Sequence, residues 1–427
     1  MATIPLAAPV LPKSLQFMAS RLSGYSRRKV RIVSTSSTTA SGGSILQIKL
    51  PQEVVDLSTL SLWGKLTTTA ATSGSNVAVY DTNMLVENYQ LTVGGQSINS
   101  TFDYPGIWFA LNQYQMGDKA NSRLLVSNML TLDANTSKHV APTTNLASRE
   151  ICIDQWLGVL GTLSPQIMDL SLMPEVILTI RFAQAEDVLV ANNATAGAVS
   201  YSLSDISMEV DVLGLPQIYY QTIQSYLSGG GVLECPFTNI VSYQGASQPV
   251  GGAIQSFQLA AQSIDAVVST VVDTSKLAKD QAARAWSSDV YNSKRFERGV
   301  SGLTDIEVKV NAVSYPIYGK VSYTRSAHSV IHNLMGGSKD ALGSCSKSLE
   351  SITAFRDSHY CHVTRFNHIN DAGDYENRLI SGLNTQGNPA VFTIQYSGST
   401  TPITPISWVF CTASLLISQF KSVEVRL

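Results

Sequence analysis

The stretch Leu46-Gln-Ile-Lys-Leu50 decides the fold class, because apolar and polar residues alternate along it. A period of two places successive side chains on opposite faces, which is typical of a β-strand with one face buried and one face in water. Five further stretches repeat the pattern at their apolar positions: Tyr89, Leu91 and Val93; Val176, Leu178, Ile180 and Phe182; Ile206, Met208, Val210 and Val212; Ile306, Val308 and Val310; Val423, Val425 and Leu427. The sequence therefore predicts a β protein.

The same region also indicates a duplication. The segment Ile48-Lys-Leu-Pro-Gln-Glu-Val-Val-Asp56 aligns with Phe257-Gln-Leu-Ala-Ala-Gln-Ser-Ile-Asp265 at an offset of 209 residues. A second short match aligns Val210-Asp-Val212 with Val423-Glu-Val425 at an offset of 213. The length of 427 residues exceeds what one ordinary core supports, since single domains mostly hold ~100 to 200 residues. We therefore expect two tandem β units.

The chain divides into four predicted segments. They are an N-terminal arm (1–27), a first unit (28–216), a linker (217–231) that ends in Gly229-Gly230-Gly231, and a second unit (232–427). Gly94-Gly95 predicts a hairpin turn, since two glycines supply positive φ angles. Short helices are expected in the arm and loops, at 13–22, 106–115 and 274–298.

Composition narrows the class of protein further. Charged residues make up 14% of the chain, against a usual ~25%, and hydrophobic residues 44%, which argues against disorder. Apolar runs stop well short of the ~20 residues that span a bilayer, so no transmembrane helix is expected. The N-terminus lacks the basic flank of a secretory signal, so synthesis in the interior of a cell, without secretion, is expected. Five scattered cysteines do not predict a disulfide scaffold.

Charge is distributed unevenly. Up to Gln52 there are seven basic residues and no acidic one, giving +7; the remainder holds 22 basic and 31 acidic residues, giving −9 and a sum of −2. A basic arm on a mildly acidic body predicts that the arm faces an anionic partner, and a solvated tail is the alternative. The candidate contact residues are Arg21, Arg27, Arg28, Lys29 and Arg31.

The motifs that usually signal enzyme chemistry are absent from the sequence. It contains no GxGxxG after a strand, no P-loop, no GxSxG, no HExxH and no EF-hand loop, so no catalytic, cofactor-binding or metal-binding residue is predicted. One cluster, His359-Tyr360-Cys361-His362, offers at most two converging ligands on a strand, whereas zinc takes three or four. We expect polar and aromatic residues at the end of a strand or in a loop contact there.

Several stretches, taken in order, resemble one protein family. They are Leu85-Val-Glu-Asn-Tyr-Gln-Leu-Thr-Val-Gly-Gly-Gln-Ser-Ile98, Val212-Leu-Gly-Leu-Pro-Gln-Ile-Tyr-Tyr220, Ser256-Phe-Gln-Leu-Ala-Ala-Gln-Ser-Ile-Asp-Ala266, Gly382-Leu-Asn-Thr-Gln-Gly387 and the closing residues 413–427. Their order and spacing resemble the double jelly-roll major capsid proteins of tailless icosahedral DNA viruses, the lineage that includes polinton-like viruses, virophages and adenovirus hexons. The resemblance runs from Arg28 to Leu427.

The resemblance implies an all-β architecture of two tandem eight-stranded jelly rolls. It further implies a viral structural protein of the virion, without enzymatic activity or cofactor, that self-assembles as a homotrimer into pseudo-hexagonal capsomers of an icosahedral shell. Implied partners are neighbouring capsomers, penton and minor capsid proteins, and an internal membrane or packaged DNA met by the basic arm. Two alternatives stay open from the residues alone: a tandem β-sandwich module that binds carbohydrate or a receptor, and a glycoside hydrolase on a β scaffold.

Overall fold

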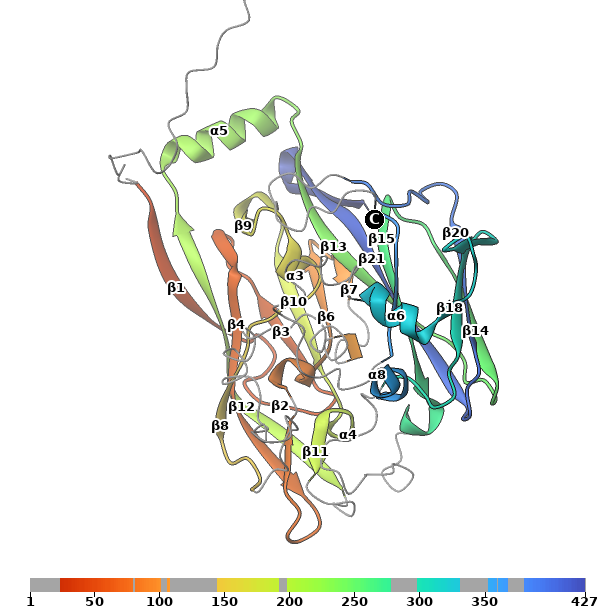
Figure 1. Ribbon diagram of the computed structural model, residues 1–427. Helices are drawn as coiled ribbons and strands as arrows, with labels where there is room; N and C mark the ends of the chain where they lie inside the picture. Colours follow the sequence, from red (N-terminus) through yellow and green to blue (C-terminus); the bar gives the residue numbers. More distant parts are fainter. Residues whose placement is uncertain are drawn as a thin grey trace, which may run out of the picture.

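Two β sandwiches lie side by side and make up the molecule (Figure 1). The computed structural model describes residues 24–79, 81–100, 106–107, 144–191, 198–277, 298–330, 352–358, 360–367 and 380–426. We refer to the sandwich built from β1 to β12 as unit 1 and to the one built from β13 to β22 as unit 2. All ladders between named strands are antiparallel.

Unit 1 has two main sheets. Sheet 1A has the order β1 (Ser26–Val33), β12 (Val199–Gly214), β4 (Val54–Ala70) and β8 (Arg149–Ile153), with β2 (Ala40–Ser41) on β12 and β9 (Ile167–Asp169) on β4. Sheet 1B has the order β3 (Ile45–Lys49), β10 (Val176–Phe182), β6 (Val86–Val93) and β7 (Gln96–Ser100). A small ribbon joins β5 (Val77–Val79) to β11 (Leu189–Ala191).

Unit 2 repeats this plan. Sheet 2A has the order β13 (Leu233–Gln244), β21 (Ile403–Ser418), β15 (Ser263–Asp273) and β19 (His362–Arg365), with β22 (Ser422–Arg426) on β21. Sheet 2B has the order β14 (Gly252–Leu259), β20 (Ala390–Ser397), β16 (Asp305–Val310) and β17 (Val313–Tyr315), with β18 (Val321–Ser322) on β16.

The two units have the same strand order. Each unit has eight strands in the four-strand orders given above, and we number these eight along the chain. In both units the first, eighth, third and sixth strands form one sheet, and the second, seventh, fourth and fifth strands form the other. This is the double Greek-key arrangement of a jelly roll, which packs two sheets face to face. The prediction of an all-β chain with two tandem jelly rolls is confirmed.

The sequence repeat marks equivalent strands at one of its two offsets. At 209 residues, β3 and β4 align with β14 and β15, which occupy the same positions in their units. The match at 213 is wrong, because it aligns β12 with β22, whereas the counterpart of β12 is β21. β22 is an additional strand that continues the sheet beyond the repeated plan.

Alternating residues form strands where one face of a sheet is buried. In β10, Val176, Leu178, Ile180 and Phe182 are buried while Arg181 is exposed, and β16 alternates in the same way. The predicted hairpin turn is confirmed: β6 and β7 pair across Gly94 and Gly95, which both have positive φ.

Helices are short and lie between strands. They are α3 (Val159–Thr162), α4 (Ala185–Val188), α5 (Gln217–Ser228), α6 (Tyr323–Ser329) and α8 (Ile352–Ser358), with 3-10 turns η2 (Thr82–Leu85), η3 (Leu170–Leu172), η4 (Thr274–Leu277) and η7 (Gln419–Lys421). The predicted helix at 13–22 lies outside the described residues, as does most of the one at 106–115.

One local prediction needs correction, and one helix was not predicted. The prediction of a helix at 274–298 is wrong at its end, because Arg298 and Gly299 are in bridge conformation and Gly299 pairs with Val272 of β15. The linker at 217–231 contains α5, which the sequence analysis did not predict. Twelve residues without Gly, Pro or a charge form this helix, and Gly230, with φ of 83°, follows its end.

Each unit has its own hydrophobic core, and the core of unit 1 extends into unit 2. Most of its members come from sheets 1A and 1B. Cys235 and Phe237 of β13 and Ala413, Leu415 and Ile417 of β21 belong to the same cluster. The two sandwiches are therefore joined by continuous apolar packing as well as by the linker.

Candidate interaction surfaces

The contact between the units is made where α3 meets the outer edge of sheet 2A. β13 is the terminal strand of that sheet. Its Thr238 amide donates to Thr162 Oγ1 at 2.8 Å, and its Pro236 carbonyl accepts from the Ser164 amide at 2.9 Å. The loop that follows β8 in unit 1 thus supplies hydrogen-bond partners for backbone groups that would otherwise be unpaired at the edge of the sheet.

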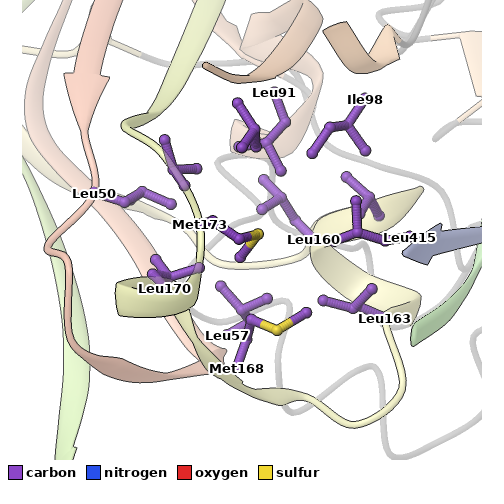
Figure 2. Close-up of a pocket in the computed structure, with 13 residues that line it drawn as sticks. Leu50, Leu57, Leu91, Ile98, Leu160, Leu163, Met168, Leu170, Met173 and Leu415 are labelled. Atoms are coloured by element: carbon purple, nitrogen blue, oxygen red, sulfur yellow. The ribbon is translucent and has the colours of Figure 1, made fainter. Parts of the chain in front are cut away.

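A small apolar cavity lies behind this contact (Figure 2). Its volume is about 20 Å³, and its lining side chains are all aliphatic or thioether, with Leu415 of unit 2 among residues of unit 1. Figure 2 shows Leu415 beside Leu160 and Leu163. A space this small without polar partners does not fit a sugar or hold an ordered water, so it is a packing defect of the interface.

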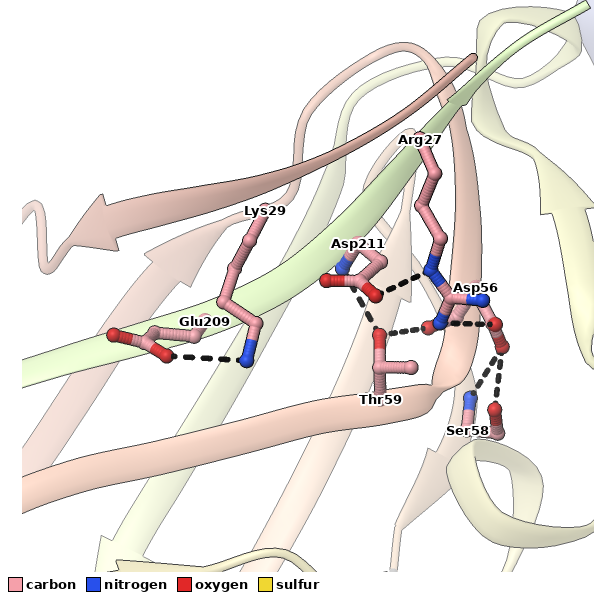
Figure 3. Close-up of polar contacts among 7 residues, drawn as sticks. All are labelled: Arg27, Lys29, Asp56, Ser58, Thr59, Glu209 and Asp211. Atoms are coloured by element: carbon pink, nitrogen blue, oxygen red, sulfur yellow. Dashed lines mark hydrogen bonds and ion pairs between the residues drawn. The ribbon is translucent and has the colours of Figure 1, made fainter. Parts of the chain in front are cut away.

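The predicted basic cluster lies mainly on β1 and is paired by carboxylates of unit 1 (Figure 3). Arg27 donates from Nε to Asp211 at 2.5 Å and from Nη2 to Asp56 at 3.1 Å. Lys29 Nζ lies 3.7 Å from Glu209. Asp56 and Asp211 are directly opposite each other on β4 and β12, so Arg27 offsets the repulsion of two like charges.

Arg28 is paired as well. Its Nη2 contacts both carboxylate oxygens of Glu53, at 2.8 and 2.7 Å. Arg31 makes none of the ion pairs found among the described residues, and Arg21 lies outside them. Arg27, Arg28, Lys29 and Arg31 are therefore residues of a paired strand rather than of a free arm, and three of them are neutralised by the body.

These carboxylates were not among the predicted site residues. Arg27, Lys29 and Arg31 recur at a period of two, and Glu209 and Asp211 do so as well. Antiparallel pairing of β1 with β12 places Lys29 opposite Asp211 and Arg31 opposite Glu209. Matched alternation of opposite charges in two strands was the available signal, but choosing β12 as the neighbour of β1 requires the topology.

Two residues of the 359–362 cluster, His362 and Cys361, are buried structural residues. His362 begins β19, with 3% of its surface exposed, and its Nδ1 lies 3.1 Å from Ser326 Oγ of α6. Burial lowers the pKa of His362 to about 4, so the imidazole is neutral near pH 7. Cys361 is also buried. His359 of the cluster lies outside the described residues.

One end of the molecule exposes apolar side chains. α5 carries no charged residue, and Ile218, Tyr220 and Tyr226 on it are exposed. β13 begins just after this helix and pairs with the end of β21, where Phe420 of η7 is 90% exposed. At this end of the molecule, α5 therefore presents an apolar and uncharged surface, in contrast to the ion-paired face of sheet 1A.

Two further findings concern the described part of the chain alone. None of its helices is both long and apolar enough to cross a membrane. Within the same ranges, no three or more His, Cys, Asp or Glu side chains are grouped so as to hold a metal ion.

Comparisons with known proteins place the fold. No known sequence family and no curated protein matches the chain. VP54 of the virus PBCV-1 superposes with a TM-score of 0.60 at 12% identity, over 97% of this chain and 99% of that chain. The Faustovirus major capsid protein superposes with a TM-score of 0.59 at 10% identity, over 95% of this chain and 92% of that chain. A chain of the Sputnik virophage structure superposes with a TM-score of 0.58 at 11% identity, over 100% of this chain and 94% of that chain.

The similarity includes both sandwiches, since almost the full length of each chain is covered. At these identities it establishes the fold and does not by itself establish the function. The chain has the double jelly-roll fold found in viral major capsid proteins.

Proposed function

We propose that this chain is the major capsid protein of a tailless icosahedral virus, and that it works by self-assembly into trimeric capsomers. The observation that carries the proposal is the duplication itself: two jelly rolls of identical strand order, aligned with capsid proteins over nearly the whole length of both chains. The role is structural, and the site of action is the virion.

The duplicated unit suits a hexagonal position in a shell. Three chains with two similar jelly rolls each place six jelly rolls around a threefold axis, and this arrangement closes into a compact ring. The low charge content of 14% supports this, because a chain that buries large surfaces against copies of itself has few charges to desolvate. The continuous apolar packing between the units keeps the two jelly rolls of one chain in a fixed orientation.

The oligomeric state tests this proposal. We expect the purified full-length chain to sediment at three times the mass of one chain and to stay trimeric on dilution, because obligate interfaces are large and apolar. Negative-stain images should show hexagonal outlines with a threefold axis. A monomer that binds an immobilised sugar would instead favour the carbohydrate-binding alternative, and a monomer without that activity would also contradict the proposal.

We further propose that the basic N-terminal segment contacts an anionic interior partner, a membrane or packaged DNA. Among the described residues of the cluster, Arg31 makes none of the ion pairs, whereas Arg27, Arg28 and Lys29 are paired with carboxylates; Arg21 lies in the segment that precedes the described residues. Residue 24 lies beside Pro216, directly before α5. The described part of the chain therefore begins at the apolar end of the molecule.

Substitution of Arg21→Gln and Arg31→Gln together should weaken binding to anionic vesicles or duplex DNA several-fold and reduce its salt dependence, because fewer counterions are released. Lys65→Gln is the matched control: Lys65 is half-exposed but pairs with Asp205 at 2.7 Å, so its loss should leave binding unchanged. Binding that does not respond to salt, or equal loss in the control, would contradict the anionic contact.

A further inference from the structure

The cations of β1 are balanced by carboxylates of the same unit. Four cations lie on the strand: Arg27, Arg28, Lys29 and Arg31. Four carboxylates lie on β12, on β4 or directly before β4: Glu53, Asp56, Glu209 and Asp211. Their formal charges cancel, so this edge of unit 1 presents little net charge although β1 itself is strongly basic.

Two of the carboxylates belong to the packing of sheet 1A. Asp56 is 8% exposed, and its Oδ1 accepts hydrogen bonds from the amide and the hydroxyl of Ser58. Asp211 lies opposite Asp56, and both accept from Arg27 (Figure 3). Removing one partner from such a group leaves a desolvated charge without compensation, so these contacts are part of the fold.

Glu53 and Glu209 have a different role. Their side chains are 44% and 28% exposed. Within the described part of the chain, neither side chain makes a hydrogen bond or ion pair except with a cation of β1, Glu53 with Arg28 and Glu209 with Lys29. Exposed ion pairs contribute little to stability, because hydration and side-chain entropy offset the attraction. Glu53 and Glu209 therefore neutralise the strand without holding the fold together.

The cations lie beside the apolar end of the molecule. Ser26, the first residue of β1, pairs with Gly214, three residues before the start of α5. Figure 1 shows the start of β1 next to the N-terminal end of α5. The exposed side chains of α5 include Ile218 and Tyr226. Release of Arg28 from its carboxylate would thus place a free cation next to an apolar surface.

The turn between β21 and β22 exposes an aromatic side chain at the same end. Phe420 and Lys421 have φ angles of 62° and 58°. L-residues with large side chains rarely adopt this left-handed region, because the β-carbon approaches the backbone. Backbone strain of this kind is concentrated at functional sites. The strained turn presents an aromatic ring and an adjacent cation to solvent.

This combination fits a lipid surface better than nucleic acid. Exposed aliphatic and aromatic side chains with neighbouring cations are typical of protein surfaces that lie in the interface of a bilayer. Duplex DNA offers phosphates but no apolar layer, and α5 carries no charge with which to meet them. Contact with DNA at this end would leave Ile218, Tyr226 and Phe420 without an apolar partner.

We infer that this end of unit 1 docks on an anionic lipid surface, and that Glu53 and Glu209 mask Arg28 and Lys29 until lipid phosphates displace them. The two glutamates form an autoinhibitory contact, because binding requires each cation to exchange one anion for another. The apolar side chains of α5 and η7 then enter the interface. The inference rests on the proposed anionic contact, and it names the partner and what regulates its binding.

The double variant Glu53→Gln with Glu209→Gln tests the mask in the full-length chain. It releases two cations and keeps the contacts of Asp56 and Asp211 with Arg27. It should bind vesicles of phosphatidylcholine and phosphatidylserine in equal parts roughly 10- to 25-fold more tightly than the unaltered chain, since each cation near an anionic membrane contributes a factor of about five. Vesicle flotation measures the binding, and the gain should disappear at high salt.

Glu307→Gln with Glu424→Gln is the matched control. It removes the same charge from the chain, and its carboxylates pair with Lys309 and Arg426 of unit 2, at 3.2 and 3.4 Å. This variant should bind the vesicles as the unaltered chain does. An equal gain in the control would attribute the effect to net charge and overturn the mask.

The remaining outcomes separate this inference from the contact it rests on. If the double variant binds like the unaltered chain while Arg21→Gln with Arg31→Gln weakens binding, the mask is overturned and the anionic contact stands. Absence of binding to anionic vesicles and to duplex DNA in every protein would overturn both. A gain for duplex DNA without a gain for vesicles would overturn the assignment of lipid. Should the double variant fail to fold, Glu53→Gln and Glu209→Gln are measured singly, and no gain in either would overturn the mask.

Discussion

Leu415→Ala should lower the free energy of unfolding by about 3 kcal/mol, because it removes a buried side chain and enlarges a cavity that already exists. Leu415 is 2% exposed and belongs to the core of unit 1 although it lies on β21 of unit 2. Its loss weakens the packing that holds the two sandwiches together. Urea unfolding followed by tryptophan fluorescence, at one fixed protein concentration, measures the change.

Ile254→Ala is the matched control for this substitution. Ile254 is on β14 with 50% of its surface exposed, so its truncation should change stability by no more than about 0.5 kcal/mol. Equal losses in the two variants would show that Leu415 does not couple the units. A loss in Leu415→Ala that appears as two separate unfolding transitions would instead show that the units unfold independently once this contact is weakened.

Period and repeat were sufficient to predict the fold class. Alternation in β10 and β16 identifies strands with one buried face, and the match of residues 48–56 with 257–265 identifies two strands and their connection in both units. The second match failed because two short segments with the pattern Val-acidic-Val arise wherever a strand has a wet face. Only the pairing of β22 with β21 shows that this strand is an addition.

The interaction surfaces were less accessible to sequence reasoning. A count of charge along the chain predicted an unpaired basic arm, but Arg27 meets Asp56 and Asp211, which lie 29 and 184 residues away in the sequence. Pairing at that separation depends on the strand order of sheet 1A. Capping of β13 by Thr162 and Ser164 has no sequence signal at all, because polar residues of this kind occur in most loops.

His362 should make the protein less stable as the pH falls from about 6.5 to about 4. Burial lowers the pKa of His362 to about 4 in the folded chain, whereas an exposed histidine titrates near 6.5. Between these values the unfolded chain binds a proton that the folded chain does not, so the stability present above pH 6.5 is lost progressively on acidification. A difference of this size corresponds to about 3 kcal/mol by pH 4.

The variant His362→Gln isolates this contribution, because carboxylates that titrate near pH 4 act equally on both proteins. The difference in unfolding free energy between the unaltered chain and the variant should shrink or change sign from pH 7 to pH 4.5. A difference for His362→Gln that stays constant with pH would contradict the prediction, because it would show that the imidazole takes up its proton at the same pH in the folded chain as in the unfolded chain.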